Sequence, residues 1–437
     1  MQDKAQKIVK DLLYYDRREL ITLNLFWIGF IIYTVSWTLS KSTQVNFILC
    51  QLFQILGIII FVPACIRLMQ FRFSNEYQKV LFIIYILWST ITVLRGIELD
   101  KEALKGIIFD PWFGGFLYFA PLIMLFPPKL IYIKKIFDVI VILGVFYVIY
   151  DLMFLSDLMD PDGENVLSRD IVEYFSKTLS ITVAFILLTY TYHSKPKLFY
   201  ALCILLLTIF FALVRARRGL LIATVGPIFL LYLLYFYNVK KKSVVIILSA
   251  LVGFIALSIF LYLLNQDAFM ANFELMAKRG TEDTRSKVED YFFYDMEGLD
   301  WVIGRGMSGK YYSPTIGVGN YRSTIETDYL NIILKGGSIS LVLLLLIIVP
   351  AAVLGIFYSK NTLSKAGGLW IIFWIINLYP STIQVFTLNY LIVWVSVGLC
   401  YSRTFRNIPE RVLKFYFLPS GAIGSPRTKT KEKPQLQ

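Results

Sequence analysis

The chain has 437 residues, of which 57% are hydrophobic, 16% aromatic and only 17% charged, and its formal net charge is +13. This composition excludes an ordinary soluble protein, because apolar runs of about 20 residues, long enough to cross a bilayer, recur almost from end to end. The positive charge does not indicate a nucleic-acid partner, because the cytoplasmic loops of membrane proteins collect Lys and Arg.

The apolar runs between charged breaks predict one polytopic all-α membrane protein with about twelve transmembrane helices. No small-residue cleavage site follows the first run, which favours a retained helix over a signal peptide. The predicted spans cover residues 20–39, 46–66, 80–94, 112–126, 136–155, 178–192, 198–214, 220–237, 244–264, 329–357, 369–379 and 385–401. They divide the chain into an N-terminal membrane bundle (1–264), an extracytoplasmic loop region (265–323), C-terminal membrane helices (324–402) and a cytoplasmic tail (403–437).

Loop charges predict the orientation, because Lys and Arg near helix ends favour the cytoplasm. With the N-terminus inside, the inside segments are basic, "KKK" at 240–242 among them, and opposite loops such as "ELDKEALKGIIFD" are mixed or acidic. Both termini are therefore expected in the cytoplasm. The only histidine, His193, then falls in a cytoplasmic loop and is expected to be a surface residue. The four cysteines show no metal-type spacing and are expected to be small buried residues without disulfides.

The segment "VRARRG" breaks the charge pattern, because the seventh span runs outward and leaves Arg215, Arg217 and Arg218 at the extracytoplasmic face. One interpretation is interfacial anchoring, with arginines that extend to lipid phosphates. The other is an anion site, since Arg215 and Arg218 share a helical face and carry planar, permanently charged groups suited to phosphate oxygens.

The connection between the ninth and tenth spans is about sixty residues long, a size that is usually functional or disordered. Its aromatic residues and glycine turns favour a compact folded cap, and "MANFELMAKRG" has the pattern of a short amphipathic helix. Thr281 or Thr284 is expected to cap a short helix that carries Arg285. Arg285 and Arg305 are candidate anion ligands, with a solvated surface position as the alternative. "GRG" at 304–306 lacks the strand and helix of a dinucleotide site.

Two acids, Glu326 and Asp328, stand at the entrance to the tenth span. Acids at a helix N-terminus are stabilised by the dipole and by free N–H groups, so a structural role is one interpretation. Glu326, Tyr329 and Leu330 are expected on one helical face. "GGS" at 336–338 would let the helix bend or another backbone approach closely.

Three segments resemble motifs of the bacterial O-antigen ligase and O-antigen polymerase superfamily of integral membrane glycosyltransferases. "RRGLLIATVGPIFLLYLL" resembles the family's S-R-G-A-like helix start, and "TRSKVEDYFFYDMEGLDWVIGRG" is similar to its loop arginine, aromatic stretch and G-x-G turn. "ETDYLNIILKGG" resembles the H-N-x-Y-L-x-x-L-x-x-x-G segment at the loop's exit. Together the segments extend from about Arg215 to Leu346, and their order carries the resemblance.

The resemblance implies a polyprenyl-diphosphate-linked glycan donor, arginines that bind the diphosphate, and transfer to an acceptor hydroxyl without a metal, nucleotide or other cofactor. By position, Arg218 matches the arginine of the helix start and Arg285 that of the loop; Arg215, Arg217 and Arg305 are neighbouring candidates for the diphosphate. Glu326 and Thr327 stand where the family has histidine and asparagine. Glu326 is then either the base or a residue that orients the sugar, and Asp328 and Tyr329 are candidates for binding the acceptor.

The expected function is polymerisation of lipid-linked repeat units into a cell-envelope polysaccharide at the outer face of the bacterial inner membrane. The missing histidine favours a polymerase over a ligase. The resemblance also implies flippase and chain-length regulator proteins as partners. A transporter or flippase of the same lipid is an alternative, but it would place charges near mid-bilayer within a repeated architecture, and no clear repeat is present. A catalytically silent scaffold is a further alternative.

Overall fold

The computed structural model describes residues 15–42, 45–73, 75–159, 166–215, 217–238, 242, 284–314 and 320–418. These residues are mostly helical, and their only sheet is an antiparallel pair of short strands, β1 (Tyr311–Tyr312) and β2 (Tyr321–Arg322). In this part of the chain, eight helices are long and apolar enough to cross a membrane. The all-α class is confirmed. The predicted span at 244–264 and the amphipathic segment at 270–280 lie outside the described residues.

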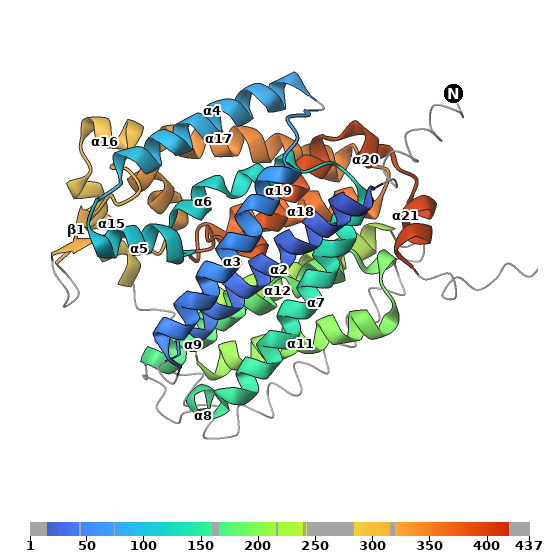
Figure 1. The fold of residues 1–437 in the computed structure, drawn as a ribbon, viewed down its shortest axis with the longest axis horizontal. Coiled ribbons are helices and arrows are strands. Elements are labelled where there is room, and N and C mark those ends of the chain that lie inside the picture. The colour runs from blue at the N-terminus through green and yellow to red at the C-terminus, as the bar shows by residue number, and fades with distance from the viewer. Residues whose placement is uncertain are drawn as a thin grey trace, which may run out of the picture.

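The described helices range from single turns to long membrane-length rods (Figure 1). In order they are α2 (Arg17–Leu39), α3 (Phe47–Leu68), α4 (Glu76–Arg95), α5 (Lys101–Phe109), α6 (Gly115–Phe119), η1 (Ala120–Leu125), α7 (Leu130–Met153), α8 (Leu155–Leu158), α9 (Val166–Phe175), η2 (Ser176–Ser180), α10 (Val183–Leu188), η3 (Tyr190–Tyr192), α11 (Lys195–Val214), α12 (Arg218–Asn238), α15 (Thr284–Asp295), α16 (Gly298–Ile303), α17 (Asp328–Phe357), α18 (Thr362–Asn377), α19 (Leu388–Tyr401), α20 (Arg403–Asn407) and α21 (Glu410–Phe417).

The predicted spans correspond to these helices with some differences. The segment at 112–126 forms two short pieces, α6 and η1, and the eleventh prediction corresponds to α18, which begins seven residues earlier than expected. The sixth forms a continuous run from Asp170 to Leu188 that includes a π-helical turn at η2. The total of twelve spans stays a prediction.

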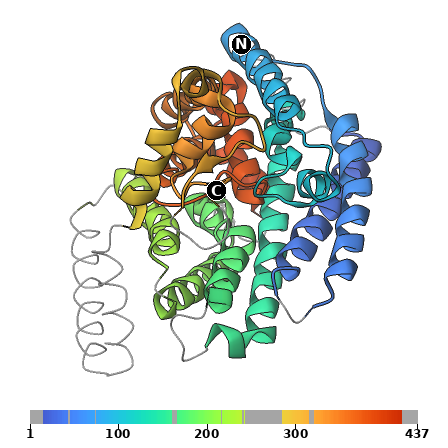
Figure 2. The ribbon, with the colours of Figure 1, turned by 90° about the vertical axis from the view of Figure 1, so that its left-hand side faces the viewer.

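Helices α2 and α3 pack closely along their length (Figures 1 and 2). Glycines make this approach possible: a Cβ on Gly29 would lie 2.7 Å from the carbonyl oxygen of Gly57, and a Cβ on Gly57 would lie 2.7 Å from that of Gly29. Small residues at a helix crossing are typical of membrane helices, whose association depends on close packing.

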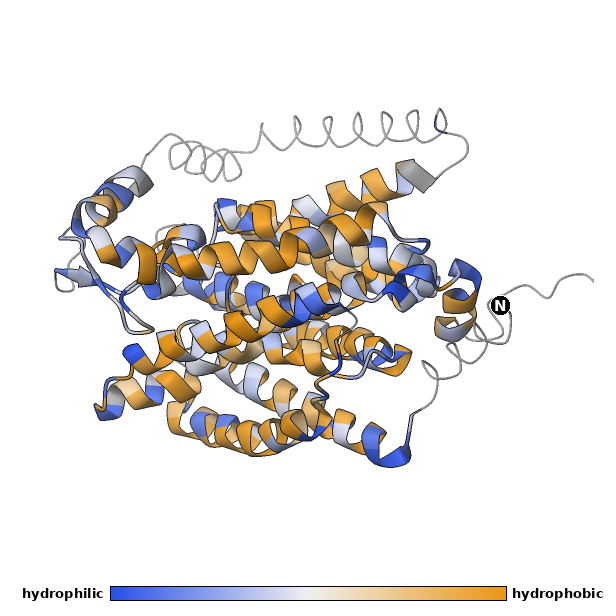
Figure 3. Cartoon of the chain, turned by 90° about the horizontal axis from the view of Figure 1, so that it is seen from above, coloured by the Kyte–Doolittle hydropathy of each residue, from blue (hydrophilic) through white to orange (hydrophobic). Residues whose placement is uncertain are grey.

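Large apolar side chains cover much of the outer surface of the long helices. On α3, Ile59 and Ile66 are 63% and 65% exposed, and Leu52 is 58% exposed. Figure 3 shows apolar residues along the long helices and hydrophilic segments gathered toward their ends. A continuous exposed apolar surface on helices of this length indicates a lipid-facing surface.

The bundle has two ends with different chemistry. At the first, here called the basic end, the starts of α2, α7, α11, α18, α20 and α21 meet. Glu19 binds the Lys129 ammonium at 2.5 Å there, and Glu410 accepts from the Tyr192 hydroxyl at 2.8 Å. At the opposite end, here called the loop end, α5, α15, α16, the two strands and the 378–387 loop lie together.

His193 lies at the basic end, but the prediction that it is a surface residue is wrong. It is only 9% exposed, its ring stacks edge-on against Phe137 at 4.4 Å, and its Nε2 lies 3.0 Å from Thr189 Oγ1. The expectation for the cysteines holds in part: Cys50 and Cys400 are buried, whereas Cys203 is exposed, and none of the four forms a disulfide.

A break in α17 joins the membrane helices to the loop end. Gly337 has φ 69°, so the helix is interrupted there, and a Cβ on Gly337 would lie 2.0 Å from the carbonyl oxygen of Val302. The amide nitrogens of Arg305 and Gly306 donate to the carbonyls of Leu334 and Lys335 at 2.7 and 2.8 Å. The predicted role of the "GGS" segment in bending and close approach is confirmed. The "GRG" turn supplies hydrogen bonds to carbonyls near the break.

Candidate functional site

The three neighbouring arginines between α11 and α12 have three different environments. Arg215 is 1% exposed, and its guanidinium donates from Nε to the carbonyl of Leu158 at 2.9 Å and from Nη2 to that of Asp157 at 3.1 Å. These carbonyls belong to the short helix α8. The last carbonyls of a helix have no N–H donor within the helix, so they need a donor from elsewhere. The contacts give Arg215 a structural role in place of the expected diphosphate-binding one.

Arg217 is paired with two carboxylates. Its Nη2 lies 2.7 Å from Asp170 Oδ1 and its Nη1 lies 3.1 Å from Glu173 Oε2, and its side chain is 19% exposed. Two negative charges beside one guanidinium leave no net positive charge in this group. Arg217 therefore holds the start of α12 against α9, and an incoming anion would have to compete with both carboxylates.

Arg218 is the first residue of α12 and is exposed. Among the described residues, none forms a hydrogen bond or an ion pair with its side chain. The helix N-terminus adds partial positive charge at the same place. Of the three arginines, Arg218 is the one that this structure presents to solvent for an anion.

A buried lysine extends the charged group inward. Lys177 is 6% exposed and lies in the π-helical turn η2; its Nζ lies 2.5 Å from Glu173 Oε1 and donates to the carbonyl of Thr382 at 2.9 Å. Asp170, Glu173, Lys177 and Arg217 thus form one connected set, here called the charged cluster. π-helical turns occur often at functional sites.

The 378–387 loop between α18 and α19 connects the charged cluster to the start of α17. Asp328 is fully buried, and its Oδ2 accepts from the amide nitrogens of Ile383 at 2.5 Å and Gln384 at 2.7 Å. The Asp328 amide donates to the carbonyl of Leu378 at 2.8 Å. Asp328 therefore fixes this loop against α17, which is a different use of the carboxylate from the predicted contact with the acceptor.

The same loop contacts the start of α12. A Cβ on Gly219 would lie 3.2 Å from the carbonyl oxygen of Pro380 and 3.3 Å from Cβ of Ser381, so only a glycine fits without displacement at this contact. The "RRG" and "ETD" segments are more than a hundred positions apart in the sequence. Both pack on this one loop, and the structure therefore brings Arg218 and the entrance of α17 to the same region of the loop end.

The other residues predicted at the entrance of α17 are separated by their environments. Glu326 is exposed and lies before the helix, which begins at Asp328, so the expectation that Glu326, Tyr329 and Leu330 share a helical face is wrong. Tyr329 donates from its hydroxyl to the carbonyl of Ile375 at 2.6 Å. Thr327 donates from Oγ1 to Glu289 Oε1 at 2.5 Å, which joins α15 to the entrance of α17.

The two loop arginines also differ. Arg285 lies in α15, which confirms the predicted helix around it; its side chain lies outside the described part of the structure. Arg305 binds Asp295 and lies 2.7 Å from Asp300 Oδ2, and it donates to the carbonyl of Lys310 at 2.8 Å. Burial lowers the pKa of Arg305, but the hydrogen bonds and charges of Asp295 and Asp300 outweigh it and raise the pKa above its ordinary value. Arg305 is thus a structural clamp of the loop.

A small polar pocket lies beneath the loop end, next to Asp328. Its lining includes Asn331, Lys335 and Gln384 together with the rings of Trp112 and Tyr118. Asn331 is 8% exposed, and its Oδ1 has no hydrogen-bond partner among the described residues; the Lys335 ammonium donates to the carbonyl of Gly309 at 2.8 Å. Buried amide and ammonium groups beside aromatic rings form a surface suited to hydroxyl groups.

Sequence reasoning missed Lys177, Glu173 and Lys335. A signal was present for Lys335, because it is a single charge inside the apolar run 329–357, and ionisable residues within membrane spans are usually paired and functional. Lys177 gave a weaker signal, because it lies just before the predicted span at 178–192 and follows Asp170 and Glu173. The 378–387 loop gave no signal of this kind, since it acts through backbone N–H and carbonyl groups.

Comparisons of the chain with models of protein families, with curated proteins and with solved structures find no match in any of the three. The geometry of the loop end is therefore the only basis, beside the sequence motifs, on which a function is assigned to the chain.

Proposed function

We propose that the protein is a membrane glycosyltransferase that polymerises polyprenyl-diphosphate-linked oligosaccharide units at the outer face of the bacterial inner membrane. One observation supports this most directly. The "RRG" start of α12 and the "ETD" entrance of α17 both contact the 378–387 loop, so that a solvent-facing arginine and an exposed carboxylate belong to one end of the bundle.

In this proposal Arg218 and the N-terminus of α12 bind the diphosphate of the donor, and Arg285 is a second ligand. The oxygen of the acceptor hydroxyl bonds to the anomeric carbon, and the bond from that carbon to the diphosphate breaks. The diphosphate leaves with the electron pair, and Glu326 takes the hydroxyl proton. If Glu326 instead orients the acceptor sugar, the departing diphosphate takes this proton. A cation that binds the charge developing on the leaving group is worth about 3 kcal/mol of transition-state stabilisation at comparable sites.

The acceptor would lie between Glu326 and the polar pocket next to Asp328. Asn331 Oδ1, which lacks a partner, would accept a hydrogen bond from a sugar hydroxyl, and Trp112 would contribute an aromatic face. Binding of the acceptor does not need a deep pocket, since the glycan extends into solvent while its lipid stays in the bilayer.

A transporter for the same lipid is the main alternative. Lys177 and Lys335 are charges within spans, as a transporter would need, but both bind backbone carbonyls of the loop end, Thr382 and Gly309. Charges at one end rather than at mid-span favour the enzyme. A ligase would use the same donor chemistry and differs only in its acceptor.

The test is complementation of a deletion strain with wild type, Arg218→Ala, Arg285→Ala and Glu326→Gln at equal membrane levels, with lipid-linked and surface glycans resolved by length. Arg67→Ala is the control, because it removes an exposed arginine from the basic end. We expect single repeat units to accumulate in the Arg218 and Arg285 variants and long chains in the control.

Other outcomes separate the alternatives. Long lipid-linked chains that never reach their final acceptor would identify a ligase. Repeat units trapped on the cytoplasmic side would identify a transporter. Normal chain lengths in all three variants would refute the site.

A further inference from the structure

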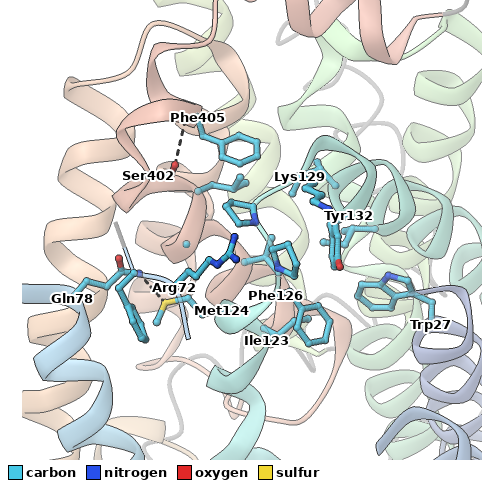
Figure 4. Close-up of a pocket in the computed structure, with 18 residues that line it drawn as sticks. Trp27, Arg72, Gln78, Ile123, Met124, Phe126, Lys129, Tyr132, Ser402 and Phe405 are labelled. Atoms are coloured by element: carbon cyan, nitrogen blue, oxygen red, sulfur yellow. Dashed lines mark hydrogen bonds between the residues drawn. The ribbon is translucent and has the colours of Figure 1, made fainter. Parts of the chain in front are cut away.

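A pocket at the basic end, far from the proposed catalytic region, is built from segments that no motif of the sequence singles out. It lies where the α3–α4 connection, the Pro127–Lys129 turn and the end of α19 meet, and a backbone hydrogen bond from Gln70 to the carbonyl of Leu125, at 2.8 Å, holds the first two together. Figure 4 shows the Arg72 side chain in the middle of this group.

The polar groups that line the pocket are mostly hydrogen-bond donors. Trp27 is 4% exposed, and its indole Nε1 is buried without a partner in the part of the chain that the structure describes. Gln78 donates from Nε2 only to the sulfur of Met124, a weak acceptor, at 3.2 Å. Ser402 Oγ accepts from the amide of Phe405 at 3.4 Å, which leaves the hydroxyl proton to donate. An unpartnered buried donor is costly in a membrane protein, so an acceptor that reaches it would be bound favourably.

The charge balance of the pocket is positive. Lys129 is paired with Glu19, which also accepts from the Tyr132 hydroxyl at 3.0 Å, so this group is close to neutral. Arg72 is exposed, and no residue in the described ranges forms an ion pair or a hydrogen bond with its side chain. One unpaired guanidinium and several donors form a site that matches an oxyanion and does not match a cation.

We propose that this pocket binds the phosphate group of a phosphate ester, with Arg72 as its principal ligand and Trp27 Nε1 as a further donor. The pocket has a volume of about 70 Å³. A cavity that holds one water has a volume of about 10–15 Å³ on the same scale. The pocket therefore has room for a phosphate group but not for a whole lipid.

The surroundings favour an anionic lipid as the source of the phosphate. The pocket opens at an end where basic residues gather near helix ends, and its walls are apolar, with Phe73, Phe126 and Leu399 among them. A headgroup phosphate would enter at Arg72 while the acyl chains stay against the exposed apolar helix surface. The proposal is independent of the glycosyltransferase assignment, because no residue is shared between the two sites.

The experiment uses the purified full chain in detergent and follows bound lipid by native mass spectrometry and the midpoint of thermal unfolding. The probes are phosphatidylglycerol, phosphatidylcholine, and inorganic phosphate against chloride at equal ionic strength. We expect phosphatidylglycerol to bind best and to raise the midpoint, because a ligand that binds only the folded state stabilises it. Arg72→Gln should weaken this binding about tenfold, the effect of losing one charge-assisted contact.

Two further variants keep the test specific. Arg67→Gln removes the same charge from the same end without touching the pocket and should leave binding unchanged. Trp27→Phe removes the unpartnered N–H and keeps a ring, but it leaves a small cavity in the core, so the quantity compared is the rise in the midpoint on adding lipid; this rise and the binding should both be weaker than in wild type.

Binding of inorganic phosphate that Arg72→Gln abolishes would support the site and assign it to a soluble phosphate ester. Equal effects of Arg72→Gln and Arg67→Gln would overturn the proposal. Equal binding of the two lipids, which both carry a phosphate, would overturn its assignment to an anionic lipid.

Discussion

Arg215 and Arg218 are three positions apart, yet the structure gives them opposite environments: one is buried against the carbonyls of α8 and the other faces solvent. Arg215→Ala takes the guanidinium donor away from the buried carbonyl of Leu158 and leaves the carbonyl of Asp157 with the Ser168 hydroxyl, so we expect it to lower the free energy of unfolding by about 1–3 kcal/mol. Arg218→Ala should change it by less than about 0.5 kcal/mol, as is usual for an exposed residue.

Thermal unfolding of the two purified variants in detergent measures this difference, and the glycan assay described above is its counterpart. Together they separate a structural arginine from a functional one. Equal destabilisation by both substitutions would show that the environments assigned to them are wrong.

His193 allows a pH prediction because it is the only histidine in the chain. Burial, with the charge of Lys197 nearby, lowers the pKa of His193 to about 3. The unfolded chain takes up a proton below about pH 6.5, whereas the folded chain does not, so stability is lost as the pH falls through that range. Between pH 7 and pH 5 the loss from this group should reach about 2 kcal/mol.

The measurement compares the midpoint of thermal unfolding of wild type and His193→Gln at both pH values. The substitution itself changes the stability at pH 7, so the quantity compared is the change in the unfolding midpoint with pH. We expect the wild type to lose more than the variant. Parallel pH dependences would mean that His193 can be protonated in the folded protein.

At the level of elements, the break in α17 is the feature with the strictest backbone requirement. Gly337 has φ 69°, a backbone conformation that strains any residue with a Cβ. In Gly337→Ala the Cβ would also lie 2.0 Å from the carbonyl oxygen of Val302, which is a steric collision. We expect it to lower the free energy of unfolding by about 3 kcal/mol or more.

Gly106→Ala in α5 is a matched control, because nothing lies within 4 Å of its Cβ position and the residue is helical. Gly106→Ala should leave the free energy of unfolding unchanged or raise it by up to about 1 kcal/mol. Thermal unfolding in detergent measures both variants. A Gly337→Ala protein as stable as the control would show that α17 is not broken at this point.

The element-level comparison shows which features a sequence can predict. Helices such as α3 and α11 follow from long apolar runs alone, and the "GGS" segment indicated the break in α17 through its residue types. The division of 112–126 into α6 and η1 and the π-helical turn at η2 were not predictable, because tertiary packing selects these local geometries. For the same reason, the sequence could not show that Arg215 is buried against the carbonyls of α8 or that Arg305 is held by two carboxylates of its own loop.

For the whole molecule, the candidate site depends on a contact that no motif encodes. The sequence indicated Arg218 and the 326–328 segment separately, and only the 378–387 loop places them at one end. That loop contributes main-chain atoms, with Asp328 accepting from two of its amides, so its residue types carry little information. The side of the membrane on which this end lies is expected from loop charges alone.

The orientation can be tested with single cysteines in a chain whose four native cysteines are replaced. Asn320→Cys is exposed at the loop end and Lys360→Cys is exposed at the basic end. Because Lys and Arg favour the cytoplasmic side, a membrane-impermeant maleimide should label the Asn320 position in intact cells and the Lys360 position only after the membrane is opened. Labelling in the opposite order would place Arg218 and Glu326 in the cytoplasm. A lipid-linked glycan already exported to the outer face could not then reach them, and the proposed function would fail although the helix bundle stays the same.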